Sequence, residues 1–251
     1  MNSRNGTLVD GTRLAAGEVV QLKSGQELVF GTPDQRWQVT EVGDPGLFAE
    51  ASGGDECRAE GDLLALPDDE NPIVTVYQDN AGFWVVEQEG LIERIGDRHE
   101  VEVEGRRWMI NLPGTDDGTQ ELVASMATVD GLQLEFAVSS DEEHVELRAR
   151  HGEREYDLKA RAHHYLLLTL ARQRIKDAED SDEPASSHGW VYQDDLSKML
   201  RLDDNAIYLA VYRARKQLKT AGVTGAAGIV ERRAATRQLR IGVSALQVRR
   251  I

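Results

Sequence analysis

Arginine and lysine side chains near the C-terminus are the groups of this sequence with the clearest chemical use, which is phosphate binding. They stand in two short stretches, residues 213–219 and 232–240. Guanidinium and ammonium groups donate charge-assisted hydrogen bonds to phosphate oxygens, and proteins hold the DNA backbone in this way. The residues that we predict to contact DNA are Tyr208, Tyr212, Arg213, Arg215, Lys216, Lys219, Arg233 and Arg237.

The net charge of the chain reverses along its length. Residues 1–150 contain 11 Lys and Arg against 31 Asp and Glu, a net charge of −20, whereas residues 151–251 contain 18 against 13, a net charge of +5. The isoelectric point of the whole chain is near 4.9, but the field at one face decides whether DNA binds there. The alternative is that the arginines form a solvated face that folds back on the acidic first half.

A helix is expected to position the first basic stretch. Four apolar residues at helical spacing form one narrow seam: Ile207, Val211, Ala214 and Leu218. Asp203 and Asp204 are suited to cap the start of this helix, and Gly222 is suited to end it near Ala221. Two further helices are predicted over Arg161–Ala178 and Gln193–Leu200.

Strands are predicted on both sides of these helices. The hairpin that carries Arg233 and Arg237 has strands Ile229–Arg233 and Gln238–Ile241. Period-two alternation predicts earlier strands at Thr7–Val9, Val19–Leu22, Glu27–Phe30, Trp37–Val42, within Ile73–Leu112, and at Leu132–Val138, His144–Arg150 and Arg154–Leu158.

The predicted fold class is therefore α+β. Gly43–Pro72 contains nine acidic residues and one basic residue, which is typical of a solvated linker. The domain boundaries that we predict are 1–43 for a β-sandwich fragment, 44–72 for an acidic linker, 73–131 for a β-rich segment and 132–251 for a DNA-binding domain.

The C-terminal region resembles the effector domain of OmpR/PhoB-type transcriptional regulators. The matching stretches are Tyr165–Ala171, Ile207–Leu218 with Arg213-Ala214-Arg215-Lys216, and the hairpin, so the resemblance covers roughly residues 132–243. It implies a winged helix-turn-helix, in which one helix enters the major groove and the hairpin contacts phosphates or the minor groove. Ala234–Leu239 replaces the Gly-rich, Tyr-containing wing end that is usual in that family.

The first residues resemble the second half of a forkhead-associated (FHA) domain, a β-sandwich that binds phosphothreonine peptides. Ser3–Gly11 and the glycines at 17, 25 and 31 carry this resemblance over some 35 residues. It implies that Arg4 and Asn5 lie in a recognition loop, where the Asn5 amide holds the peptide backbone, and that Gly6 permits a tight turn. In the simplest alternative, Asn5-Gly6 is only a hairpin turn.

Half of a sandwich would leave an open sheet edge and an uncovered apolar face. Two explanations are open: Met1 is an internal methionine of a longer natural protein, or the fragment is a degenerate remnant that Ile73–Leu112 completes. We favour the first.

Other classes of site find little support. His163 and His164 are adjacent and lack ligand partners at metal spacing, so we expect packing or capping roles, with no metal and no cofactor. Asp141–His144 is interpreted as a solvated turn, and the sequence lacks a P-loop, a Gly-x-Ser-x-Gly elbow and a His-Glu-x-x-His helix, so an enzyme is not expected. Cys57 is the single cysteine, and no apolar run is long enough for a membrane span, which predicts a cytoplasmic protein.

The sequence thus predicts a bacterial-type transcription regulator with double-stranded DNA and a threonine-phosphorylated protein as partners, and with no membrane contact. The alternative is a phosphopeptide-binding adaptor whose winged helix makes protein contacts only.

The half-sandwich generates a prediction about the gene. An in-frame extension upstream of the Met1 codon should encode a Gly-Arg and a Ser-x-x-His, because Ser3–Gly31 supplies only the later strands of the sandwich. Reading the genomic sequence there tests this expectation, and a stop codon directly upstream with no such residues would contradict it.

Overall fold

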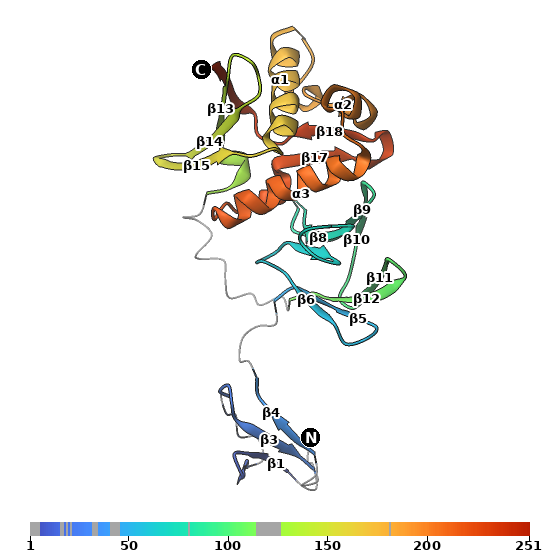
Figure 1. Cartoon of the computed structure of the whole chain (residues 1–251). Helices are drawn as coiled ribbons and strands as arrows, with labels where there is room; N and C mark the ends of the chain where they lie inside the picture. Colours follow the sequence, from blue (N-terminus) through green and yellow to red (C-terminus); the bar gives the residue numbers. More distant parts are fainter. Residues whose placement is uncertain are drawn as a thin grey trace. The chain divides into compact units, whose positions relative to one another are not determined.

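The computed structural model describes residues 6–15, 18, 20, 22–31, 35–40, 46–79, 81–113, 127–180 and 182–251. The chain divides into two compact units, Met1–Pro45 and Gly46–Ile251 (Figure 1). The described residues form separate sheets, most of them antiparallel, and three α-helices, which confirms the α+β class.

The first unit is a four-stranded antiparallel sheet with the strand order β2-β1-β3-β4. Its strands are β1 (Thr7–Val9), β2 (Thr12–Arg13), β3 (Glu27–Phe30) and β4 (Arg36–Gln38). Cross-strand pairing places Leu28 opposite Trp37, and Trp37 and Phe30 are 63% and 45% exposed. This unit therefore presents large apolar side chains on one face of its sheet.

The strands predicted at Thr7–Val9 and Glu27–Phe30 are confirmed. Asp10 and Gly11 both have positive φ angles, of 48° and 78°, and form the β1–β2 turn, as Asp-Gly pairs do in two-residue hairpins. Val19 and Gln21 lie outside the described residues, so the strand predicted at Val19–Leu22 is not tested.

Residues 46–113, which we call the β-module, form two packed antiparallel sheets. One sheet has the order β10-β9-β8-β7 and the other β11-β12-β5-β6. The strands are β5 (Phe48–Ala51), β6 (Glu56–Arg58), β7 (Leu64–Leu66), β8 (Val74–Gln78), β9 (Trp84–Gln88), β10 (Leu91–Arg94), β11 (His99–Val103) and β12 (Arg106–Asn111). The core between the sheets includes Leu64, Val76, Trp108 and Ile110.

The prediction of a solvated linker over 44–72 is wrong for the part that the structure describes. Strands β5, β6 and β7 lie inside Gly46–Pro72, and Ala49, Leu64 and Leu66 are fully buried. The acidic residues occupy turns and outward positions of short strands, and they outnumber the few apolar residues that face the core. Composition alone therefore could not distinguish a solvated linker from a folded segment of short strands.

Residues 127–251, which we call the helical module, combine two sheets with three α-helices. The first sheet contains β13 (Gln133–Val138), β14 (Val145–His151), β15 (Arg154–Ala160) and β19 (Ala245–Arg250), in the order β15-β14-β13-β19. The second contains β16 (Val191–Tyr192), β17 (Val230–Arg233) and β18 (Gln238–Ile241), in the order β16-β18-β17. The α-helices are α1 (His164–Asp180), α2 (Gln193–Leu200) and α3 (Asp204–Thr220). Short 3₁₀ helices are η3 (Val129–Gly131), η4 (Ala185–Ser187), η5 (Ala226–Ile229) and η6 (Ala234–Thr236).

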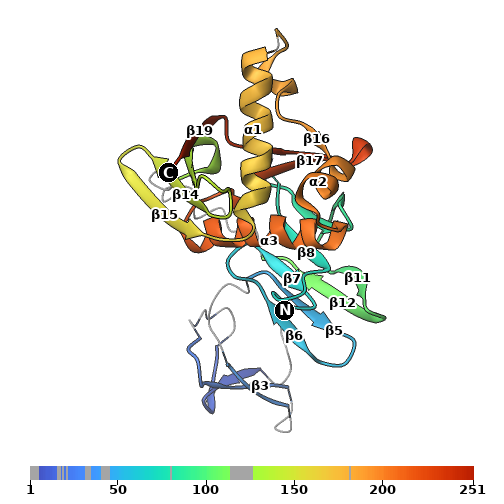
Figure 2. The same cartoon turned by 45° about the horizontal axis from the view of Figure 1, so that its top comes forward.

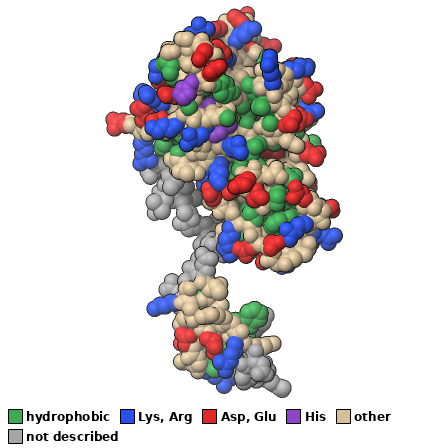
Figure 3. Space-filling model, viewed as in Figure 1, with side chains coloured by type: hydrophobic (Ala, Val, Ile, Leu, Met, Phe, Trp, Pro, Cys, Tyr) green, Lys and Arg blue, Asp and Glu red, His purple; other side chains and the backbone are tan. Residues whose placement is uncertain are grey.

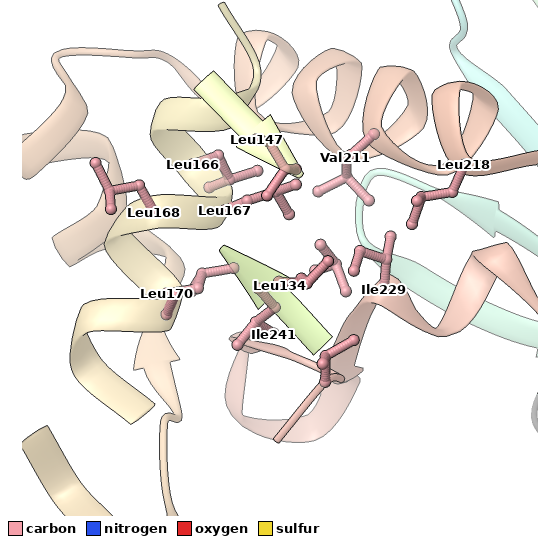
Figure 4. Packing of buried hydrophobic residues seen from close by; sticks show 14 of the residues in the cluster. Leu134, Leu147, Leu166, Leu167, Leu168, Leu170, Val211, Leu218, Ile229 and Ile241 are labelled. Carbon is pink, nitrogen blue, oxygen red and sulfur yellow. The ribbon is translucent and has the colours of Figure 1, made fainter. Parts of the chain in front are cut away.

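The helices and the hairpin occur where the sequence predicts them. The Asp203 carboxylate accepts a hydrogen bond from the Ala206 amide at 2.8 Å, which caps the start of α3. The seam of α3 is buried, with Val211 and Leu218 only 1% and 2% exposed, and it packs against α1 and the strands (Figure 4). Strand β19 was not predicted, and it pairs in parallel with β13.

Helix α3 runs across the helical module, and β8–β10 of the β-module lie against it (Figures 1 and 2). Among the described helices, none is both long enough and apolar enough to cross a membrane.

Truncation of Leu64 tests whether the acidic region is folded. Leu64→Ala should lower the free energy of unfolding by about 2–5 kcal/mol, because a fully buried leucine leaves a cavity. Leu91→Ala is the matched control: Leu91 is 68% exposed, so its loss should change stability by less than about 0.5 kcal/mol. Urea unfolding of both variants measures the difference, and equal, small effects would show that the region is a solvated linker after all.

Candidate nucleic-acid interface

Helix α3 contacts other parts of the chain on three sides. Its apolar seam faces the core of the helical module, and its second side faces the β-module. The residues on the second side, which we call the outer stripe, are Tyr208, Tyr212, Arg215, Lys216 and Lys219. All five belong to the predicted DNA-contact set, so the structure brings most of that set to one surface.

Strands β8 and β9 present the surface that meets the outer stripe, and they are buried on both faces. Thr75 pairs with Glu87 and Tyr77 with Val85, so these four side chains share one face of the sheet. Val74, Val76 and Val86 point the other way, into the core of the β-module. Both faces of β8 and β9 are therefore covered, which is why residues of both faces are buried along these strands.

A buried ionic cluster links β9 to α3 and the hairpin. Arg215 Nη1 donates to Glu87 Oε2 at 2.7 Å, and Arg232 Nε lies 2.7 Å from Glu87 Oε1. Tyr77 donates its hydroxyl to Glu87 Oε2 at 2.7 Å, and the Arg215 guanidinium lies 4.3 Å from the centre of the Tyr77 ring. The side chains of Arg215 and Arg232 are each 3% exposed and that of Glu87 is 7% exposed, so two cations share one carboxylate away from water.

The contacts within this cluster determine the protonation state of its side chains. Burial opposes ionisation of Glu87, but the charges of Arg215 and Arg232 and the hydrogen bonds from Arg215 and Tyr77 lower its pKa to about 2. Burial raises the pKa of Tyr77, which therefore remains a donor. Burial alone would lower the pKa of Arg215, but Glu87 outweighs burial and raises it, whereas burial and the neighbouring Arg215 lower the pKa of Arg232.

Carboxylates of the β-module also contact the rest of the outer stripe. Lys216 Nζ lies 2.8 Å from Asp69 and 3.3 Å from Glu60, and Lys219 Nζ lies 2.6 Å from Asp62. The Tyr212 hydroxyl donates to Asp69. On the face seen in Figure 3, Lys and Arg side chains accordingly border Asp and Glu side chains where the two modules meet.

Tyr208 lies beside the turn between β9 and β10. Gly90 has a φ angle of 77°, and a Cβ atom there would lie 3.3 Å from the Tyr208 hydroxyl and 3.2 Å from Arg232 Nη1. Glycine is therefore favoured at this turn both by its backbone conformation and by the closeness of α3. The Arg232 guanidinium stacks 5.1 Å from the centre of the Tyr208 ring, and Gln193 Nε2 donates to the Tyr208 hydroxyl.

The two hairpin arginines of the predicted set, Arg233 and Arg237, remain at the surface of the helical module. Arg233 stacks on Trp190, with its guanidinium 4.0 Å from the ring centre. Arg237 pairs with Asp204 at 2.9 Å and with Asp194 at 3.7 Å, and its side chain is 55% exposed. Both belong to the predicted DNA-contact set.

Two members of the predicted set depart from the expected arrangement. Arg213 is exposed but lies outside the outer stripe, because each helical residue turns by 100° from the last. Arg215 Nε donates to the Ala227 carbonyl at 3.0 Å and Nη2 to the Val230 carbonyl at 3.3 Å. Because these bonds hold η5 and β17 against α3, Arg215 is a structural anchor and is not free to reach a base edge.

A third side of α3 meets two histidines. With Nε2 protonated, His163 and His164 each donate to Gln217 Oε1 at 2.8 Å, and Gln217 Nε2 donates to the Leu158 carbonyl at 2.6 Å. His163 and His164 are 9% and 0% exposed, so they have the packing role that the sequence predicts. Within the described parts of the chain, no group of three or more His, Cys, Asp and Glu is arranged to hold a metal ion.

Of the predicted phosphopeptide-binding residues, Arg4 and Asn5 lie outside the described residues. Gly6 precedes β1 and has a φ angle of 71°, which suits the turn expected of it.

Sequence reasoning missed the groups that cover α3. They are Glu60, Asp62, Asp69, Tyr77 and Glu87 of the β-module; Arg232, in the predicted basic stretch, was not expected to pair with one of them. One signal could have found the central group: Glu87 follows Trp84-Val85-Val86 inside a strand, and a carboxylate in such a place requires a buried cation.

No protein-family profile matches this chain, and neither the curated proteins nor the solved structures contain a match to it.

The histidine contact predicts how stability depends on pH. Burial lowers the pKa of His163 to about 4 from an ordinary 6.5, against the hydrogen bond to Gln217. Between these two values the unfolded chain binds more protons than the folded chain. His163 therefore contributes stability above pH 6.5, and this contribution, on the order of 1–3 kcal/mol, is lost as the pH falls towards 4.

Urea unfolding between pH 7 and pH 4 tests this linkage. His163→Gln is the matched control, since it cannot titrate, and its unfolding free energy should fall less steeply with pH than that of the natural chain. Identical slopes for the two proteins would contradict the assignment.

Proposed function

We propose that this protein is a transcription regulator that binds duplex DNA through the helical module, which acts as a winged helix, and that its first unit belongs to an FHA-type phosphothreonine-recognition domain.

The element order supports the winged-helix proposal. Strand β16 lies between α1 and α2 and pairs with β18 of the C-terminal hairpin, so the hairpin and the three helices share one core. Helix α3 has 17 residues, which corresponds to about 26 Å. A helix of this length fits the major groove when one face is held by its own domain.

The observation that carries the proposal is that the outer stripe already binds a row of anionic groups. Lys216, Lys219 and Arg215 each contact a carboxylate, and these carboxylates come from a separate module of the chain. A surface that pairs with several spaced carboxylates has the charge and the donors needed for a row of phosphates.

The proposal divides the roles among the predicted contacts as follows. Lys216 and Lys219 would contact phosphates, and Tyr208 and Tyr212 would lie nearest the base edges. Arg233 and Arg237 would contact the backbone from the hairpin, and the exposed Arg213 would do so from α3, outside the outer stripe.

The phosphothreonine part of the proposal rests on the first unit. Strands β1, β2 and β3 occupy the segment that resembles an FHA domain, and the exposed Trp37 and Phe30 give the sheet of the first unit an apolar face. The resemblance covers only later strands, so recognition by these 251 residues alone is expected to be incomplete.

An adaptor function is the alternative, and one observation favours it. The outer stripe contacts protein, and this contact includes an apolar cluster as well as ion pairs. In this alternative, the winged helix serves protein contacts only.

DNA titration of the fragment 127–251 tests the proposal. The buried core of the helical module is drawn entirely from residues 129–243, so the fragment retains it. At about 50 mM salt the fragment should bind duplex DNA, and each phosphate contact should contribute about 0.9 to the slope of log affinity against log salt. Arg233→Ala and Arg237→Ala should each reduce that slope by about 0.9 and weaken binding to all sequences alike.

Arg148→Ala is the matched control, because Arg148 is exposed on β14, outside α3 and the hairpin. Its loss should leave the slope unchanged. A folded fragment that binds neither random nor promoter DNA at low salt would reject the proposal and favour the adaptor.

A further inference from the structure

We infer that the β-module and duplex DNA bind the same surface of α3 and therefore exclude each other. This inference rests on the proposed function, and it adds how that function is controlled: DNA can reach α3 only after the β-module has left it.

The charged contacts place anions where phosphates would bind. Carboxylates from three separate segments of the β-module meet the cations of one helix: Asp62 at Lys219, Asp69 at Lys216, and Glu87 at Arg215. Residues 46–113 contain 16 Asp and Glu against 5 Lys and Arg, so the module as a whole is strongly anionic. Its surface towards α3 therefore has the same sign of charge as a nucleic acid at the positions of these three cations.

The contact between the β-module and α3 also buries apolar side chains, so it consists of more than ion pairs at the surface. Leu63, Tyr77 and Val85 of the β-module pack with Tyr212 of α3, and each of these residues is at most 6% exposed. Because Tyr212 is covered, the middle of the outer stripe cannot touch a base pair while the module is docked.

When the β-module is docked on α3, the positive charges of the buried cluster are not fully neutralised. Among the described residues, Glu87 is the one carboxylate that pairs with Arg215 and Arg232, so the buried cluster has two cations and one anion. Arg232 Nη2 has no hydrogen-bond acceptor among the described residues, and Arg232 Nε, although it lies 2.7 Å from Glu87 Oε1, makes an ion pair there and no hydrogen bond. A buried guanidinium with an unused donor favours an environment that offers more anionic oxygens. The phosphates of a DNA backbone would supply such oxygens to Arg232, which lies in the hairpin. DNA can therefore compete with the β-module for this surface.

The expected effect follows from a closed–open equilibrium. Apparent affinity for DNA equals the affinity of the open state multiplied by the fraction of molecules that are open. Glu87→Gln removes the carboxylate that pairs with both buried guanidiniums and changes no residue of the helical module. It should therefore increase the open fraction and raise the DNA affinity of the full chain about tenfold or more.

The experiment compares the full chain with its Glu87→Gln, Glu87→Lys and Glu102→Gln variants. Glu102 is exposed on β11, in the other sheet of the β-module, so its variant makes the same charge change away from α3. Docking is measured separately from DNA binding, through the rate at which an acetylating reagent labels Lys216 and Lys219. Lys198, whose side chain is 77% exposed, is the internal reference.

In the Glu87 variants, labelling of Lys216 and Lys219 should rise relative to Lys198, and DNA should bind more tightly, whereas Glu102→Gln should match the natural chain. The inference is overturned if labelling rises without any gain in DNA affinity, or if neither Glu87 variant changes the labelling. The proposed function fails separately, if the fragment 127–251 does not bind DNA either.

Discussion

The ion pair between Glu87 and Arg215 is the interaction on which the arrangement of the second unit depends. Removing two charges from water is costly, and the cost is repaid only when partners and hydrogen bonds satisfy both groups. Here Tyr77 and Arg232 complete the carboxylate shell, and the Ala227 and Val230 carbonyls complete that of Arg215. The pair therefore joins β9, α3 and the segment leading into the hairpin at one point.

Other features of the second unit are consistent with β9 being held against α3 by this ion pair. Strands β8 and β9 need two apolar faces, because one faces the core of the β-module and the other faces α3. The turn at Gly90 needs glycine, because Tyr208 and Arg232 lie against it. Helix α3 carries tyrosine and basic side chains on a side that would be solvated if the helical module stood alone, so the same residues suit both a docked protein surface and a nucleic acid.

The sequence was sufficient to predict most of the helices and strands, but it was insufficient to predict the contact between the β-module and the helical module. The seam of α3, its cap at Asp203 and the two hairpin strands follow from periodicity and from residue types near helix ends. Strands β5–β7 were missed because their acidic outward residues outnumber the buried leucines. The pairing of Glu87 with Arg215 joins residues far apart in the chain, and no local pattern encodes which of many carboxylates faces which arginine.

Competition in trans would test most directly whether the β-module and DNA share one surface. The module 46–113 has a core of its own, and it would be added to a complex of the fragment 127–251 with a labelled duplex. We expect the module to displace the DNA as its concentration rises, and the module with Glu87→Gln to do so much less well. A ternary complex of module, fragment and DNA, or no displacement at a concentration where the module binds the free fragment, would contradict the account.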